Sequence, residues 1–123
     1  MKTEGIQGLL VETHNWGKTV AFWRELGFEL EKETENHWGL LRHPGSGPYV
    51  FVTERPEGHP LAIVPILGVP DAAGFLPPSA GSVRRPFEAQ HWSALEMLLA
   101  DPDAREVSVQ APMPEGEAPA GHG

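Results

Sequence analysis

The chain has 123 residues, with nine Lys or Arg against seventeen Asp or Glu, and a formal net charge of −8 at pH 7. This length fits a single domain, and the acidic balance argues against a nucleic-acid partner, which would need a basic face. No apolar run approaches the roughly 20 residues of a membrane span, and the start of the chain lacks the apolar stretch of a secretory signal, so we expect a cytoplasmic protein. The absence of cysteine excludes disulfides, thiolate metal sites and cysteine nucleophiles.

The first predicted elements are a strand over residues 5–13 and a helix over residues 16–26. Asn15 is the expected N-cap of the helix, and Gly27 stands where a left-handed residue ends it. The large apolar residues of the helix are expected on one stripe, formed by Trp16, Val20 and Trp23 and widened by Phe22 and Leu26. The helix therefore covers a sheet to which the first strand belongs.

Three more strands are predicted over residues 28–35, 37–42 and 48–54. Four glutamates alternate with other residues along the first of them, at positions 29, 31, 33 and 35. Period two places these glutamates on one face of the strand. The pattern favours a solvated outer face, with a surface for a basic ligand as the alternative.

The second half of the chain repeats this order of elements. Residues 61–69 predict a strand in which Pro65 indicates an edge or a bulge, and residues 70–76 can form only a short helix. A short strand over 82–85 is possible, and the segments 94–100 and 105–110 predict a hairpin around the turn at 101–104. The Pro/Gly-rich residues 111–123 are expected to form a flexible tail.

The predicted fold class is therefore α+β, with two βαβββ modules in a single domain over residues 1–110. Module one covers about residues 4–56, and module two about residues 59–110. Open strand edges and the thin cover over the apolar segment 61–67 predict a homodimer.

Two segments carry a resemblance to a known family. Residues 21–28, AFWRELGF, resemble the F-Y-x-x-x-L-G-F signature that follows the first strand of the glyoxalase/bleomycin resistance protein/dioxygenase (vicinal oxygen chelate) superfamily. Trp92, followed after eight residues by Asp101-Pro102-Asp103, resembles its closing W-G…D-P-D-G hairpin. Ser93 and Ala104 depart from the pattern, because glycine is usual at both positions. The resemblance implies that the two modules form a curved mixed sheet around a cleft.

The resemblance also implies where a metal would be bound. The metal-dependent members place His or Glu ligands on the first and fourth strands of each module, at positions that correspond here to Gly8, Phe51, Val64 and Ser108. The first three side chains cannot coordinate a metal, and a serine hydroxyl is a poor ligand. We therefore expect no metal site at the family positions, no cofactor and no catalytic residues.

Eight residues are the candidates for ligand binding: Trp38, Tyr49, Phe51, His91, Trp92, Glu96, Ser108 and Gln110. Period two places Tyr49 and Phe51 on one strand face, and Ser108 with Gln110 on another. An apolar, aromatic cleft with a few polar groups is the usual composition of a small-molecule site. The alternative is that the aromatic residues belong to the core.

The residues leave three functions open. The leading hypothesis is a metal-free, homodimeric protein that binds a planar or partly cationic small molecule and sequesters an antibiotic or a metabolite. The second is a metal-dependent lyase, isomerase or dioxygenase with a relocated metal site, for which His91, Glu96 and Glu106 are the first candidates. The third is a non-catalytic interaction module whose ligand is its own partner subunit. Whether the protein is an enzyme stays undecided at this level.

Overall fold

A computed structural model describes residues 2–35, 37–90 and 92–114, and their contacts form two compact units. The N-terminal unit is Gln7–Val64, and the C-terminal unit contains the residues from Pro65 onward together with the segment that ends at Ile6. That short segment belongs to the C-terminal unit because the Glu4 N–H donates to the Gly68 carbonyl over 2.8 Å. Each unit is described separately below.

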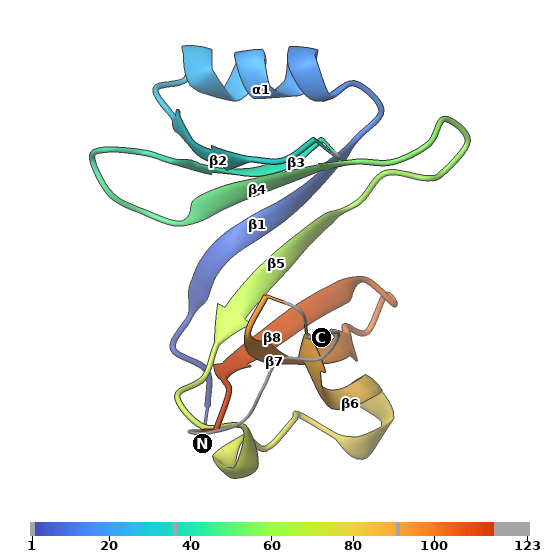
Figure 1. Cartoon of the computed structure of the whole chain (residues 1–123). Helices are drawn as coiled ribbons and strands as arrows, with labels where there is room; N and C mark the ends of the chain where they lie inside the picture. The colour runs from blue at the N-terminus through green and yellow to red at the C-terminus, as the bar shows by residue number, and fades with distance from the viewer. Residues whose placement is uncertain (1, 36, 91, 115–123) are drawn as a thin grey trace. The chain divides into compact units, whose positions relative to one another are not determined.

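The N-terminal unit contains a four-stranded sheet and the helix that covers one of its faces (Figure 1). Its elements are β1 (Ile6–Thr13), α1 (Trp16–Glu25), β2 (Glu29–Glu33), β3 (Trp38–Arg42) and β4 (Tyr49–Glu54). The strand order is β2-β3-β4-β1, in which β1 runs parallel to β4 and the other pairs are antiparallel. All five elements agree with the sequence prediction to within a few residues.

The core of this unit lies between α1 and the sheet. Its buried members are Val11, Val20, Leu41, Val50 and Val52, with Trp16 and Trp23 packed against them. The predicted stripe was wrong for Phe22 and Leu26, whose exposed fractions are 59% and 54%. At 100° per residue, Phe22 lies 200° from Val20 and so faces away from the sheet.

Both ends of α1 are fixed by local hydrogen bonds. The Asn15 side chain accepts from the Lys18 N–H over 3.0 Å, which confirms the predicted N-cap, and Gly27 has a φ of +102°. Glu54 reaches the first turn from the end of β4, and its Oε2 accepts from the Trp16 N–H over 2.9 Å. The Nδ1 of His37 lies 2.9 Å from the other carboxylate oxygen. The hydrogen bonds with His37 and with the Trp16 N–H hold the pKa of Glu54 below its ordinary value of 4.5.

We expect the substitution Glu54→Gln to remove part of the acid sensitivity of the protein. A carboxyl whose pKa is lowered by folding stabilises the folded state above its unfolded pKa, and this contribution is lost as the pH falls through the lower, folded pKa. The wild type should therefore exceed the variant in stability above pH 4.5, and the difference should shrink below it. Urea unfolding across this pH range measures the effect, and a difference that is constant with pH would contradict the assignment.

The C-terminal unit contains the strands that follow β4. Its elements are β5 (Ile63–Gly68, which begins in the N-terminal unit), the 3-10 turns η1 (Ala72–Gly74) and η2 (Ala80–Ser82), and the strands β6 (Val83–Gln90), β7 (Ala94–Ala100) and β8 (Glu106–Pro112). The order is β5-β8-β7-β6, with β5 parallel to β8 and the other pairs antiparallel. η1 lies within residues 70–76, where a short helix was expected, and Gly74 and Pro77-Pro78 disfavour a longer one. None of the helices in the described ranges is long and apolar enough to cross a membrane.

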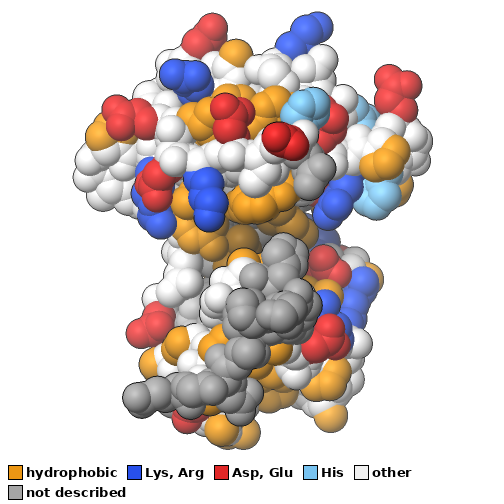
Figure 2. Space-filling view, viewed as in Figure 1, with side chains coloured by type: hydrophobic (Ala, Val, Ile, Leu, Met, Phe, Trp, Pro, Cys, Tyr) orange, Lys and Arg blue, Asp and Glu red, His pale blue; other side chains and the backbone are white. Residues whose placement is uncertain are grey.

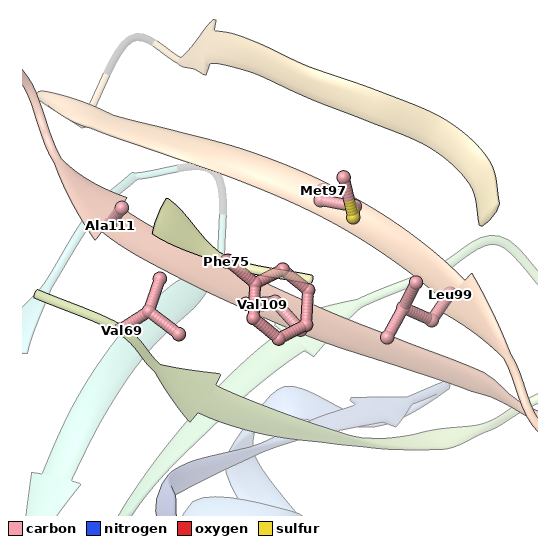
Figure 3. Packing of buried hydrophobic residues seen from close by; sticks show 6 residues of the cluster. All are labelled: Val69, Phe75, Met97, Leu99, Val109 and Ala111. Carbon is pink, nitrogen blue, oxygen red and sulfur yellow. The ribbon is translucent and has the colours of Figure 1, made fainter. Parts of the chain in front are cut away.

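The core of the C-terminal unit lies on one face of its sheet (Figure 3), and Ala72 of η1 packs against it. Its buried members are Val69, Phe75, Met97, Leu99, Val109 and Ala111. The predicted tail began two residues too early, because β8 continues to Pro112. Ala111 is 3% exposed and pairs with Leu95 of β7. Residues 115–123 of that tail lie outside the described residues. The strand expected at 82–85 extends to Gln90, because Pro86 occupies the outermost strand, where its missing N–H is tolerated. The α+β class is confirmed, and so is the repeated succession of strands in the two halves of the chain.

Candidate functional site

The face of the N-terminal sheet that points away from α1 carries aromatic side chains. Along β4, Val50 and Val52 enter the core, so Tyr49 and Phe51 lie on the opposite face. Trp38, on β3, stacks on Phe51 with ring centroids 5.2 Å apart and an interplanar angle of 25°. We call Trp38, Tyr49 and Phe51 the aromatic face. All three are half-buried, so they retain exposed surface that a ligand can contact.

Tyr49 lies across the backbone of the neighbouring strand β1. Gly8 is its direct partner in the register, and a Cβ atom at Gly8 would lie 2.5 Å from both Cδ1 and Cζ of the Tyr49 ring. The guanidinium carbon of Arg42 lies 5.5 Å from the centroid of the same ring, in a cation–π arrangement. The ring therefore occupies the space that any side chain at position 8 would need.

Charged pairs flank the aromatic face within this unit. Arg42 also binds Glu31 over 2.9 Å, an exposed pair worth little to stability. On β1, the half-buried Glu12 accepts from Arg55 Nε over 2.8 Å and from the Ala62 N–H over 3.0 Å. Figure 2 shows hydrophobic side chains exposed between charged ones on the unit that carries α1. An apolar surface with a few polar groups around it is suited to a small organic molecule.

The C-terminal unit has a polar network on the sheet face opposite its core. At its centre is Glu96 on β7, whose side chain is 13% exposed. Its Oε1 accepts from Arg85 Nη2 over 2.7 Å, and its Oε2 accepts from Ser108 Oγ over 2.6 Å and from Gln110 Nε2 over 3.3 Å. A carboxylate this buried requires such donors, because burial without them would be costly.

Trp92 is attached to the same network through Gln110. The indole Nε1 donates to the Gln110 Oε1 over 3.2 Å, while 46% of the residue stays exposed. Trp92 stands in the turn between β6 and β7, next to Ser93, which has a φ of +67°. We call Arg85, Trp92, Glu96, Ser108 and Gln110 the polar network.

Seven of the eight predicted ligand residues thus fall into two groups. Trp38, Tyr49 and Phe51 form the aromatic face of one unit, and Trp92, Glu96, Ser108 and Gln110 belong to the polar network of the other. The eighth, His91, lies outside the described residues.

Sequence reasoning missed Arg85, the cation of the polar network. The hairpin pairs Glu88 with Glu96, and continuing that register would place Pro86, not Arg85, opposite Leu98. An irregularity between Arg85 and Glu88 shifts the register by one residue and brings Arg85 opposite Leu98, on the face of Glu96. The bulge is a tertiary feature that no spacing rule predicts.

The described part of the chain offers few metal ligands. Within it, no group of three or more His, Cys, Asp or Glu residues could hold a metal ion. Two candidate ligands of a relocated metal site, Glu96 and Glu106, lie in this part of the chain. Glu96 accepts hydrogen bonds from Arg85, Ser108 and Gln110, and Glu106 lies half-buried at the start of β8. The third candidate, His91, is outside the described residues.

Comparison with solved structures places this geometry among known folds. A glyoxalase/bleomycin resistance protein/dioxygenase superfamily member from Vibrio splendidus 12B01 matches 85% of this chain and 96% of its own, with a TM-score of 0.67 and 16% identity. BphC, a halotolerant catechol dioxygenase, matches 96% of this chain and 43% of its own, with a TM-score of 0.57 and 13% identity. A bleomycin-binding protein complexed with bleomycin matches 86% of this chain and 95% of its own, with a TM-score of 0.35 and 20% identity.

The sequence itself matches no family model and no curated protein. The first of the three structures superposes well over nearly its whole length. The chain therefore has the fold of the glyoxalase/bleomycin resistance protein/dioxygenase superfamily, as the two sequence segments predicted.

Proposed function

We propose that this chain is a metal-free small-molecule binding protein that sequesters an antibiotic or a metabolite. The aromatic face of the N-terminal unit supplies the contact surface, and the C-terminal unit has a separate stacking surface in Trp92. We further propose that it works as a cytoplasmic homodimer, because the sequence predicts open strand edges that can pair with a second copy of the chain.

The observation that carries this proposal is the position of Tyr49 over Gly8. In the metal-dependent enzymes that the sequence resembles, the first strand contributes a metal ligand at this position. Here that position has no side chain, and the Tyr49 ring fills the space in which one would extend. A metal ligand at this position would require both a substitution and the displacement of an aromatic ring.

The chemistry of the aromatic face indicates a flat ligand. The stacked pair of Trp38 and Phe51 favours parallel contact with another ring, because offset stacking of aromatic systems stabilises beyond simple burial. The fold alone does not decide between binding and catalysis, since a catechol dioxygenase also has it. The side chains on the sheet are therefore the basis of the proposal.

The test combines metal content, subunit number and ligand binding. Native mass spectrometry of untagged protein, purified without chelators, should give a dimer mass without bound metal. Titration with a panel of flat aromatic compounds, bleomycin-like glycopeptides included, should then change the tryptophan fluorescence. In the Trp38→Leu variant we expect the affinity of any bound compound to fall about twofold to twelvefold, since a stacked aromatic pair contributes about 0.5–1.5 kcal/mol.

The matched control is Phe22→Leu, which removes an exposed aromatic side chain from the outer side of α1. It should leave the affinity unchanged. One metal ion per chain, with activity lost on chelation, would refute the proposal in favour of a metal-dependent enzyme. A panel without any fluorescence response would also count against it.

A further inference from the structure

The polar network contains a directional chain of hydrogen bonds that ends at Trp92. Carboxylate oxygens accept hydrogen bonds, so the Gln110 side chain turns its amide nitrogen toward Glu96, and the same nitrogen donates to Ser108 Oγ over 3.2 Å. The Gln110 oxygen consequently faces the other way, where it accepts from the Trp92 indole over 3.2 Å. The acceptor oxygens of Glu96 thus decide which end of the Gln110 amide faces the indole.

We propose that Glu96 and Arg85 are positioning residues that act through Gln110 to hold the Trp92 indole in place. If the proposed function is correct, Trp92 is a stacking surface, and these residues determine its orientation without touching the ligand. Because the indole N–H is engaged by Gln110, a ligand meets the ring faces of Trp92 and not its hydrogen-bond donor.

Arg85 gives this arrangement a testable asymmetry. In a Glu96→Gln variant, the new amide must keep its oxygen toward Arg85, which has only donors to offer. Its amide nitrogen then faces Gln110, which has to present its own oxygen in return. The Gln110 amide rotates, its nitrogen faces the indole, and two donors oppose each other. Trp92 should therefore lose its hydrogen bond although the substitution is isosteric.

The same logic predicts a rescue. In the double variant Arg85→Met/Glu96→Gln, no guanidinium holds the new amide, so its oxygen is free to turn toward Gln110. Gln110 can then return its own oxygen to the indole. Ser108→Ala is the comparison variant: it removes a donor to Glu96 and the second acceptor of the Gln110 amide nitrogen, but it leaves the Glu96 carboxylate facing that nitrogen.

The test follows the indole N–H signals of the full chain by ¹⁵N-resolved NMR, with the Trp92 signal identified by its loss in Trp92→Phe. We expect Glu96→Gln to shift this signal upfield and to speed its solvent exchange about fivefold, as the loss of one hydrogen bond implies. Gln110→Leu, which lacks the acceptor, should do the same. Ser108→Ala and Arg85→Met/Glu96→Gln should both leave the signal near its wild-type position.

The signals of Trp16, Trp23 and Trp38 report in each variant that the protein is folded. The proposal is overturned if Glu96→Gln leaves the Trp92 signal in place while Gln110→Leu moves it, or if Ser108→Ala has the same effect as Glu96→Gln. No ligand is needed, so the failure of this inference is distinct from that of the proposed function. A ligand that binds wild type and Glu96→Gln equally would show that Trp92 orientation does not affect binding.

Discussion

Replacing Gly8 by alanine should cost about 1–3 kcal/mol of folding free energy, the usual effect of forcing an extra methyl group into a packed site. A Cβ atom at Gly8 would lie 2.5 Å from two atoms of the Tyr49 ring, well inside van der Waals contact. The Tyr49 ring must then leave the β1 backbone, and its contact with Arg42 is disturbed as well. Chemical denaturation of wild type and variant measures the loss.

The double variant Gly8→Ala/Tyr49→Ala tests whether the ring is the cause. If it is, the two substitutions should be strongly non-additive, because removal of the ring makes room for the methyl group. Gly17→Ala in α1 is the control, since its nearest neighbour would be the Asn15 Oδ1 at 3.9 Å. That substitution should stabilise the protein by about 0.5–1 kcal/mol. A neutral Gly8→Ala would mean that Tyr49 does not rest on β1, and would weaken the proposed function with it.

The second large effect should come from restoring glycine at positions 93 and 104. Ser93 and Ala104 have φ values of +67° and +66°, a region that costs an L-residue about 1–2 kcal/mol. Glycine removes this cost but adds about 0.5–1 kcal/mol of backbone entropy to the unfolded chain. The expected net stabilisation is about 0.5–1 kcal/mol for each substitution. Because the two sites lie beyond opposite ends of β7, the effects should add.

The turn that contains Ala104 should keep its hydrogen bonds in the Ala104→Gly variant. The Asp101 carboxylate accepts from the backbone N–H groups of Arg105 and Asp103 over 2.8 and 2.9 Å, and the first of these bonds holds the pKa of Asp101 below its ordinary value. None of these contacts uses a side chain at 104. Thermal unfolding should show a raised midpoint for both glycine variants and a lowered one for the control Ala100→Gly, which lies in β7. A lowered midpoint in Ala104→Gly would refute the argument from strain.

The two glycine arguments show how far local sequence signals reach. The succession of elements along each module, the cap at Asn15 and the left-handed turn at Gly27 all follow from neighbouring residues, because short-range sterics and hydrogen bonds control them. The two positions where this chain departs from the family glycines are also two of the three non-glycine residues with positive φ in the described chain, the third being His37. The burial of Phe22 and Leu26 was predicted wrongly, since their position around α1 relative to the sheet was misjudged.

By itself the sequence determined the fold class, the superfamily resemblance and the lack of ligating side chains at three of the four family metal positions, because these depend on residue types and local periodicity. It also placed Tyr49 with Phe51, and Ser108 with Gln110, since alternation along one strand suffices for that. Only the tertiary structure decided that Tyr49 lies over Gly8 and that Arg85 reaches Glu96. Both contacts join different strands, and strand register, including a bulge in β6, is set by the packing of the whole sheet.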